Sequence, residues 1–481
     1  MDAATGVLGQ NGHMGSSEPL AYVRARSAAA GHAIYLGMGT GGWVWTRPQQ
    51  AVLVLGPPRS GKTFSIVIPN VLAANGAVLS TSIKADVLDA TAVARGRVGQ
   101  CWLFDPSGEV TVPQGVKPLH WSPIAACRRW DPAVVAARAM VGAARPATGM
   151  TEASHWTERA EAMLAPLLHA AALDDLTMAD VMTWVNRRAP LAAARILESN
   201  GSGLAAEVLD GVLATEERER SGIWSTAAGV LAAYRSEAAL ATTAEVNFDP
   251  AAFVDSGDTV YVCATGRQQS LVAPLVVSLI EEVRGAAYAR AKVDPSVSRP
   301  PVVLALDEVA NIAPLGDLPA IVSEGGGQGL TTLACLQDLS QARHRWGAQA
   351  DGFLSLFGAK VLLPGIGDTR TLEAVSALAG DHDVKVRSDS SPPWWARNRG
   401  RARTTTWSTR RQRRLPADAV ARGRPGMALA IEGSGAPAWV ELTPSFAAKP
   451  WSELSQERSG PEVLRSRSGL GDHRLPPVLG H

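Results

Sequence analysis

Short apolar runs bounded by glycine, proline or acidic residues recur along most of the chain. They are Ala51–Leu55, Ala77–Thr81, Cys101–Phe104, Thr259–Ala264, Val302–Leu306, Leu330–Cys335 and Lys360–Leu363. Stretches with helical spacing separate several of these runs, and this alternation predicts a parallel sheet with crossover helices. The expected fold class is therefore α/β, with a mostly parallel sheet flanked by helices.

The pattern changes in residues 132–245, where strand signals disappear and alanine, leucine, glutamate and arginine follow helical spacing. We interpret this segment as an all-α domain inserted into the sheet domain, whose two parts are residues 33–131 and 246–383. The inserted helices are expected either to recognise a substrate or to pack on the sheet. The other expected segments are a flexible N-terminus (1–32), a basic loop with closing strands at 426–432 and 438–442 (384–445), and a polar tail (446–481).

Composition and charge narrow the classes of function. Hydrophobic residues make up 46% of the chain and charged residues 19%, which excludes a mostly disordered protein. The net charge is only +1, so attraction to nucleic acid requires a local basic patch. The four cysteines are far apart, which predicts buried thiols in a reducing cytosol. No unbroken apolar run of about 20 residues and no signal peptide is evident, so we expect a cytoplasmic protein.

One basic patch lies between Lys385 and Arg424, where twelve basic residues face only Asp389 and Asp418. Tryptophans are interleaved with the arginines, and this combination can hold phosphates and stack on bases. The alternative is a solvated charge run. The candidate DNA contacts are Arg397, Arg399, Arg401, Arg403, Trp394, Trp395 and Trp407.

The strongest chemical signal follows the first apolar run. It is a complete G-x-x-x-x-G-K-[ST] motif, formed by Gly56, Pro57, Pro58, Arg59, Ser60, Gly61, Lys62 and Thr63. The strand before it and the helix after it are the context in which backbone N–H groups surround phosphate oxygens. Lys62 is expected to contact the β- and γ-phosphates of a nucleotide, and the Thr63 hydroxyl to ligate Mg²⁺.

A second signal is a pair of adjacent carboxylates, Asp307 and Glu308, at the end of the run Val302–Leu306. Burial of such a pair requires a compensating cation. In an ATPase, Asp307 would hold the Mg²⁺ shell and Glu308 would activate the attacking water. Gln337, just beyond the run Leu330–Cys335, is a weaker candidate for positioning water or sensing the γ-phosphate.

These segments together resemble the type IV coupling proteins, the TraG/TraD-like ATPases of conjugation. The resemblance covers roughly residues 33–445. Its pieces run in the family's order: GPPRSGKTFSIVIPNVL, STSIKADVLDATAVARG, LFDPSG, the helical segment, and LALDEVANIAPLGDLPAIVSEGGGQGLTTLACLQDLSQARHRWG.

The resemblance implies a RecA-like P-loop NTPase core that uses ATP and Mg²⁺ and assembles as a homo-hexamer. Implied partners are DNA, a relaxase-type protein and a secretion channel. The family usually has an N-terminal membrane anchor, so a partner is expected to recruit this chain to the inner face of the membrane. Many members carry an arginine where this sequence has Gly326 or Gly327. The candidates for an arginine finger are instead Arg370, Arg343 and Arg345.

Two other functions remain open. One is a DNA-segregation motor of the FtsK type, which shares the RecA-like core but does not carry a helical insertion at this place. The other is a docking scaffold that binds ATP without hydrolysing it, against which the intact Lys62, Asp307 and Glu308 argue.

Overall fold

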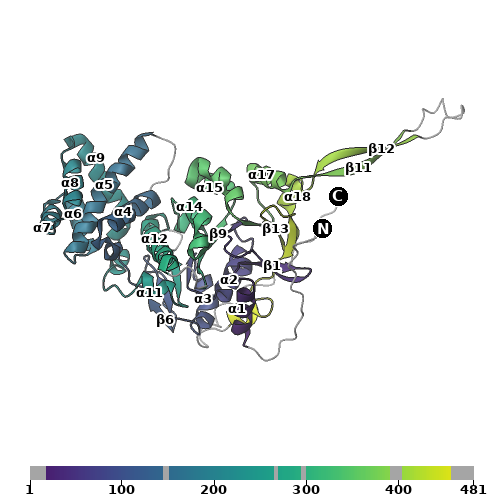
Figure 1. Cartoon of the computed structure of the whole chain (residues 1–481), viewed down its shortest axis with the longest axis horizontal. Coiled ribbons are helices and arrows are strands. Elements are labelled where there is room, and N and C mark those ends of the chain that lie inside the picture. Colours follow the sequence, from purple (N-terminus) through teal and green to yellow (C-terminus); the bar gives the residue numbers. More distant parts are fainter. Residues whose placement is uncertain (1–17, 145–150, 265–268, 294–298, 391–403, 457–481) are drawn as a thin grey trace.

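The computed structural model describes residues 18–144, 151–264, 269–293, 299–390 and 404–456. A twelve-stranded sheet runs through the molecule (Figure 1). In spatial order its strands are β2 (Gly42–Trp45), β1 (Tyr35–Gly39), β14 (Ala438–Glu441), β13 (Met427–Glu432), β10 (Ala359–Leu362), β3 (Val52–Leu55), β9 (Leu330–Leu336), β8 (Val302–Leu306), β4 (Val78–Ser82), β7 (Thr259–Cys263), β5 (Cys101–Phe104) and β6 (Val116–Pro118).

All neighbouring strands from β10 to β6 are parallel, whereas β13, β14, β1 and β2 extend the sheet in antiparallel pairs. The predicted α/β class is confirmed, and all seven predicted apolar runs form strands. Because parallel strands end at the same edge, the loops after β3, β9 and β8 lie together. These loops carry the residues for which chemistry was predicted.

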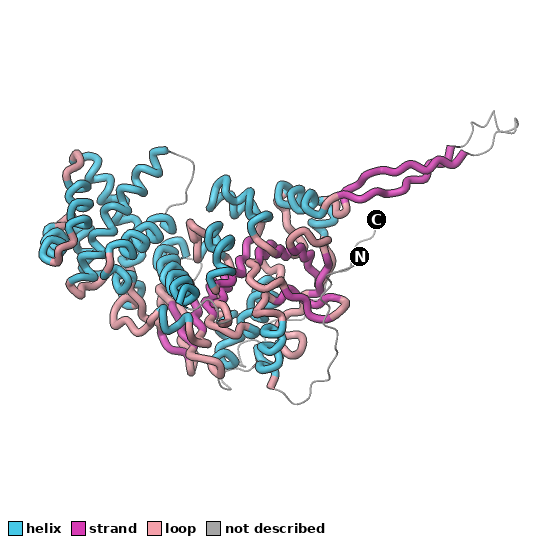
Figure 2. Tube along the Cα trace, in the orientation of Figure 1, coloured by secondary structure: helices cyan, strands magenta, loops and turns pink. Residues whose placement is uncertain are grey.

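Helices cover both faces of the sheet (Figure 2). Along β3, Leu53 and Leu55 belong to one buried cluster and Val52 and Val54 to the other, as the alternation of side chains along a strand requires. The first cluster includes residues of α11 (Pro250–Val254), α12 (Gln269–Val293), α13 (Val309–Ile312), α14 (Leu318–Glu324), α15 (Leu339–Trp346), α16 (Phe353–Leu356), α17 (Thr369–Ala379) and α18 (Ala417–Arg422). The second includes residues of α1 (Pro19–Ala29), α2 (Ile68–Ala73), α3 (Asp86–Arg95) and α19 (Trp451–Ser455).

Between β6 and β7, the described residues form helices and loops. The α-helices are α4 (Trp130–Ala144), α5 (Thr151–Leu173), α6 (Met178–Arg187), α7 (Leu191–Ser199), α8 (Gly203–Leu213), α9 (Glu217–Val230) and α10 (Glu237–Ala241). Helices α5 to α9 lie at one end of the molecule (Figure 1). Met140 of α4, Leu164 of α5 and Ile280 of α12 belong to the same buried cluster, so the helical segment shares its core with one face of the sheet.

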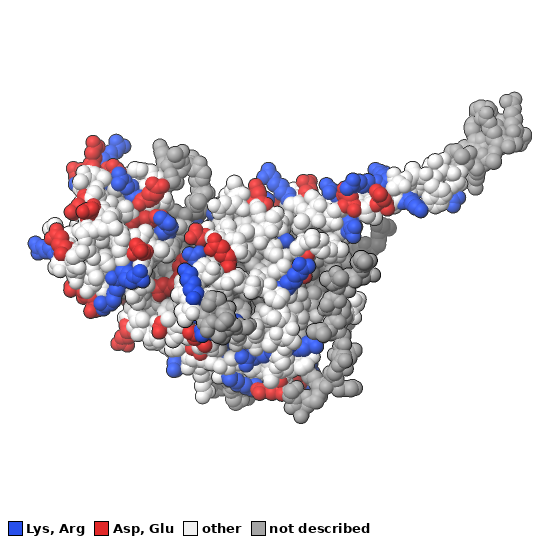
Figure 3. Space-filling view, viewed as in Figure 1, with Lys and Arg blue, Asp and Glu red and all other residues white. Residues whose placement is uncertain are grey.

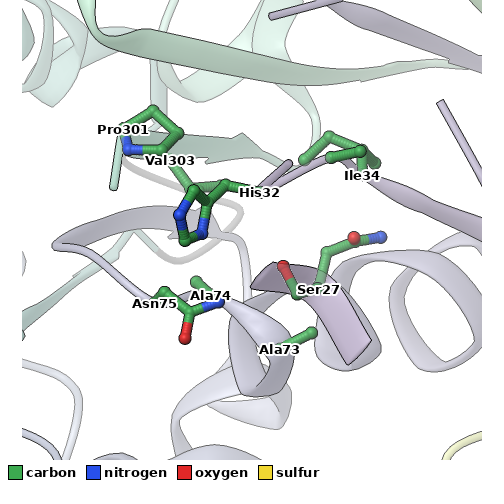
Figure 4. Close-up of a pocket in the computed structure, with 10 residues that line it drawn as sticks. Ser27, His32, Ile34, Ala73, Ala74, Asn75, Pro301 and Val303 are labelled. Carbon is green, nitrogen blue, oxygen red and sulfur yellow. The ribbon is translucent and has the colours of Figure 1, made fainter. Parts of the chain in front are cut away.

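The N-terminal segment differs from the prediction of flexibility where it is described. Residues 19–29 form α1, which buries Leu20, Val23 and Ser27. The helical spacing of these three residues was the signal for α1, but the polar composition of the segment obscured it. After α1, a pocket of about 10 Å³, no larger than one water molecule, is lined by residues that include His32 (Figure 4).

The C-terminal segment differs from the prediction in two places. Part of the expected basic loop is a hairpin of β11 (Asp381–Ser390) and β12 (Thr404–Arg413), which projects from the body at the end opposite α5 to α9 (Figure 1). Val384, Val386 and the threonines of β12 favour strands despite the charge. The expected polar tail begins with α19, which buries Trp451. The predicted closing strands are confirmed as β13 and β14.

The sequence predicts neither a membrane-spanning helix nor a disulfide framework. Among the described residues, no helix has both the length and the apolar character needed to cross a membrane. All four cysteines are free and buried, as predicted.

Candidate functional site

The loop after β3 has the tight geometry that surrounds phosphate groups. A Cβ atom at Gly56 would lie 2.7 Å from Ser60 Oγ and 2.9 Å from Leu363 Cβ, so only glycine fits there. Gly61 has a φ of +97°, which L side chains rarely adopt. The following helix begins with a π-helical turn, Thr63–Val67, and continues as α2. The motif therefore adopts the strand–loop–helix arrangement that the sequence predicted.

Lys62 places a buried cation inside this loop. Its Nζ atom donates hydrogen bonds to the carbonyl oxygens of Gly56 at 2.5 Å and Pro57 at 3.0 Å. The hydroxyl oxygen of Ser60 is buried and has no hydrogen-bond partner among the described residues. An anion in the loop would give both groups an acceptor, so the residues present fit a phosphate.

Asp307 joins the second motif to the first. The Thr63 hydroxyl donates a hydrogen bond to Asp307 Oδ2 at 2.6 Å, although the two residues are far apart in the sequence. Burial raises the pKa of Asp307 to about 6, and the charge of Glu308 also raises it, whereas the Thr63 hydrogen bond and Lys62 lower it. A divalent cation would favour the charged carboxylate. One hydroxyl and one carboxylate, with phosphate oxygens and water, are a typical ligand set for Mg²⁺.

Glu308 has an unusual backbone conformation next to Asp307. Its φ is +54°, in the left-handed region, and it is the residue that precedes α13. Asn311 Nδ2 donates a hydrogen bond to Glu308 Oε2 at 3.3 Å. Such conformations cost free energy and gather at functional sites, where the surrounding structure maintains them. Glu308 is half-buried at the same pocket as Lys62 and Thr63.

Gln337 lies between the two motifs, at the end of β9. Strand β9 pairs with β3 on one side and β8 on the other, and the Gly56 N–H donates to the Leu336 carbonyl at 3.2 Å. The Gln337 N–H donates to Gln341 Oε1 at 2.9 Å. Gln337 is not among the described residues that line the pocket of Lys62, Thr63 and Glu308. The structure thus brings Gln337 to the correct edge of the sheet, and its role stays a prediction.

The motif residues from Pro58 to Thr63 and both carboxylates line one pocket of about 430 Å³, a size typical of small-molecule sites. The loop after β4 also contributes to this pocket, and the sequence-based set of site residues did not include it. The additional lining residues are Phe64, Ser82, Ile83, Lys84 and Asp86. The parallel arrangement of the strands could have indicated this contribution, because β4 ends at the same edge of the sheet as β8.

The three arginine-finger candidates differ in their surroundings. Arg343 forms an ion pair with Asp368 at 2.8 Å. Arg345 donates hydrogen bonds to backbone carbonyls of α4 and of the segment between α13 and α14, and burial lowers its pKa to about 10. Arg370 is exposed in the first turn of α17. Arg345 is therefore engaged within the chain, whereas Arg370 faces solvent.

The hairpin carries the one DNA-contact candidate that the structure describes. Trp407 has 63% of its surface exposed and lies opposite Arg387 in the strand pair. At the base of the hairpin, Arg411 and Arg413 form ion pairs with Asp381 at 3.2 and 3.3 Å. Figure 3 shows both signs of charge together there. The other candidates lie outside the described residues: Trp394, Trp395, Arg397, Arg399, Arg401 and Arg403.

Comparisons with known proteins agree with this fold. A family model described as type IV secretory system conjugative DNA transfer matches residues 18–420. The unbound bacterial conjugative coupling protein TrwBdeltaN70 is 18% identical, with a TM-score of 0.65 over 85% of this chain and 88% of that chain. The plasmid coupling protein TrwB in complex with ADP and Mg²⁺ is 20% identical, with a TM-score of 0.63 over 84% and 87%. No curated protein matches the sequence.

Proposed function

The chain belongs to the type IV secretory system conjugative DNA transfer family, and we propose that it is the coupling ATPase of such a system. In this function, ATP hydrolysis moves DNA, or a relaxase-type protein joined to DNA, toward a secretion channel. The observation that carries the proposal is the 2.6 Å hydrogen bond from Thr63 to Asp307, at the pocket that Lys62 also lines. It unites two distant motifs in one site, as catalysis with ATP and Mg²⁺ requires.

Each residue of the pocket has a role in the proposed reaction. Lys62 and the backbone N–H groups of the loop bind the β- and γ-phosphates. The Thr63 hydroxyl and the Asp307 carboxylate would hold Mg²⁺, which would supply positive charge to stabilise the phosphates. Glu308 orients the attacking water and accepts its proton, and Gln337 helps to position that water. The ADP and Mg²⁺ bound to TrwB are consistent with these cofactors.

Two alternatives are less well supported. A scaffold that binds ATP without hydrolysing it would not need a carboxylate in the strained conformation of Glu308. An FtsK-type motor would not need the helices α4 to α10 between β6 and β7. The family match favours conjugative transfer over chromosome segregation.

The proposed assembly rests on the resemblance to the type IV coupling proteins. We infer a homo-hexamer in which a neighbouring subunit supplies an arginine to the transferred phosphate, and Arg370 is the best placed of the three candidates because it is exposed. The hairpin is proposed to contact DNA through Trp407 and the arginines nearby. The protein would work at the inner face of the membrane, where a membrane partner recruits it and the secretion channel receives the substrate.

The substitution Lys62→Ala tests the ATPase assignment. It removes the phosphate-binding cation, so ATP turnover should fall by roughly a hundredfold or more. Lys449→Ala is a matched control, because Lys449 is exposed and pairs only with Glu453 among the described residues. Both variants should give the circular dichroism spectrum of the wild type. Normal ATP turnover in the Lys62→Ala variant would refute the assignment.

A further inference from the structure

A second polar pocket, of about 570 Å³, lies at the opposite edge of the sheet from the nucleotide pocket. Its walls come from the segments just before β4, β5, β7 and β8, together with α1 and α12. The P-loop, residues 56–63, follows the carboxyl end of β3, whereas these segments precede the amino ends of strands parallel to it. The pocket is therefore separate from the nucleotide site. Helix α1, which carries Arg24, lies at the bottom of Figure 1.

The lining of this arginine pocket is strongly basic. Four arginines line it, and Asp255 is the one acidic residue among the described lining residues, which gives a formal charge of +3. The arginines come from segments far apart in the sequence: Arg24, Arg97, Arg290 and Arg299. A concentration of positive charge in a concave site raises the local concentration of anions.

Among the described residues, two of these arginines have carboxylate partners and two do not. Arg97 pairs with Glu18 at 2.9 Å and Arg299 with Asp255 at 3.0 Å. Arg24 donates to the carbonyl of Asn75 at 3.3 Å, and Arg290 donates to backbone carbonyls. No ion pair of Arg24 or Arg290 is present among the described residues.

One hydrogen-bond donor of the arginine pocket has no acceptor among the described residues. Arg24 Nε is buried and has no hydrogen-bond partner among the described residues. Burial lowers the pKa of Arg24. Burial also lowers the pKa of Arg290; the charge of Asp255 raises that pKa, and the charge of Arg299 lowers it. Guanidinium groups held in partial burial without enough opposite charge destabilise the site until an anion compensates them.

The pocket rests on a fixed frame. Arg95, which is fully buried, donates hydrogen bonds to the carbonyls of Ala74 at 2.7 Å, Gly76 at 3.1 Å and Gly257 at 2.8 Å. It also donates to the Thr259 hydroxyl at 2.8 Å. These bonds connect the segments before β4 and β7, so the walls of the pocket are held in place before any ligand binds.

We propose that the arginine pocket binds phosphate groups of a nucleic-acid backbone. Guanidinium groups match phosphate oxygens in a bidentate manner, and α1, α12 and two loops present four of them to one volume. The described lining contains no aromatic side chain on which a base could stack. Binding is therefore expected through phosphates alone, without sequence preference. The choice of DNA as the source of the phosphates rests on the proposed function.

The test compares DNA binding of the full chain with that of an Arg97→Gln/Arg299→Gln double variant. Both side chains are partly exposed, at 43% and 42%, so the fold should tolerate the changes. Arg47→Gln is the matched control, because Arg47 is an exposed arginine near Glu432, outside the pocket. The affinity for a fluorescent single-stranded oligonucleotide is measured from 50 to 200 mM salt.

The double variant is expected to bind the oligonucleotide with a weaker dependence on salt than the wild type. Each lost phosphate contact should flatten the slope of log K against log salt by about 0.7, so two contacts amount to about 1.4. Over a fourfold rise in salt, the double variant should lose about sevenfold less affinity than the wild type. The Arg47→Gln variant should match the wild type. An unchanged slope in the double variant would overturn the proposal, while DNA-stimulated ATP turnover in the same preparation would leave the proposed function intact.

Chemical protection distinguishes DNA from other sources of phosphate. Arg97 and Arg299 of the wild-type chain are modified with phenylglyoxal in the presence of the oligonucleotide, phosphatidylglycerol vesicles or inorganic phosphate. Protection by the oligonucleotide supports the proposal. Protection by vesicles or by inorganic phosphate without protection by the oligonucleotide would assign the pocket to a lipid headgroup or a free anion and overturn it.

Discussion

Replacement of Asp307 by asparagine should stabilise the ligand-free protein while it removes a ligand for Mg²⁺. Burial raises the pKa of Asp307 from 3.8 to about 6, so ionisation of this carboxyl is unfavourable in the folded state. Between about pH 4 and pH 6, the folded protein keeps a proton that the unfolded chain has released. Stability therefore falls as the pH rises through this window. The full cost, present above pH 6, is about 3 kcal/mol, at about 1.4 kcal/mol per pKa unit.

Asparagine keeps the size of the side chain and an oxygen that can accept the Thr63 hydrogen bond, but it carries no charge. We expect the midpoint of thermal unfolding to rise by about 6 °C at pH 7.5, at about 2 °C per kcal/mol for a large domain. At pH 5 the gain should be about half as large. Scanning calorimetry without nucleotide or Mg²⁺ measures both values. Asp210→Asn, on the exposed side of α8, is the control and should change neither.

The same variant should lose Mg²⁺-dependent ATP hydrolysis. An unchanged or lower midpoint for Asp307→Asn at pH 7.5 would refute the claim that this carboxylate is held at a cost in stability. Such a cost at a functional residue is common, because the group is placed for its ligand and not for the fold.

Three further predictions concern single residues. Glu308→Gln should still bind ATP but slow hydrolysis by roughly 10²–10⁴-fold, because the amide is not a base; phosphate release at the wild-type rate would exclude Glu308 from the chemistry. Gly56→Ala should weaken nucleotide binding, since its Cβ would lie 2.7 Å from Ser60 Oγ; Gly142→Ala, where the space is open, is the control in a titration with a fluorescent nucleotide. Trp407→Ala should weaken binding of single-stranded DNA by about 1–3 kcal/mol without a change in thermal stability, because the ring is 63% exposed; unchanged affinity would remove Trp407 from the DNA interface.

The nucleotide pocket could be predicted from the sequence because its signals are local. The P-loop is one contiguous motif, and Asp307 follows an apolar run that identifies the strand before it. The parallel topology then brings both to one edge, as the 2.6 Å hydrogen bond from Thr63 to Asp307 confirms. The contribution of Lys84 and the loop after β4 was missed, since it depends on which strands are neighbours and no motif records strand order.

Features that depend on distant segments were beyond the sequence. The hairpin was interpreted as a basic loop because charge obscured the strand-forming valines of β11 and threonines of β12. Arg345 was a candidate for catalysis, but its guanidinium donates to carbonyls of α4, which is far from it in the chain. The arginine pocket draws Arg24 from α1 and Arg290 from α12, which are far apart in the chain, and no local pattern joins them.

The central claim is that ATP hydrolysis in the pocket between the P-loop and Asp307 serves the transfer of DNA. The most direct measurement is steady-state ATP turnover by the purified full chain with Mg²⁺, with and without DNA. The account predicts turnover that requires Mg²⁺, rises when DNA is added and disappears in the Glu308→Gln variant. Tight nucleotide binding without turnover in the wild type, or turnover that DNA does not change, would contradict it.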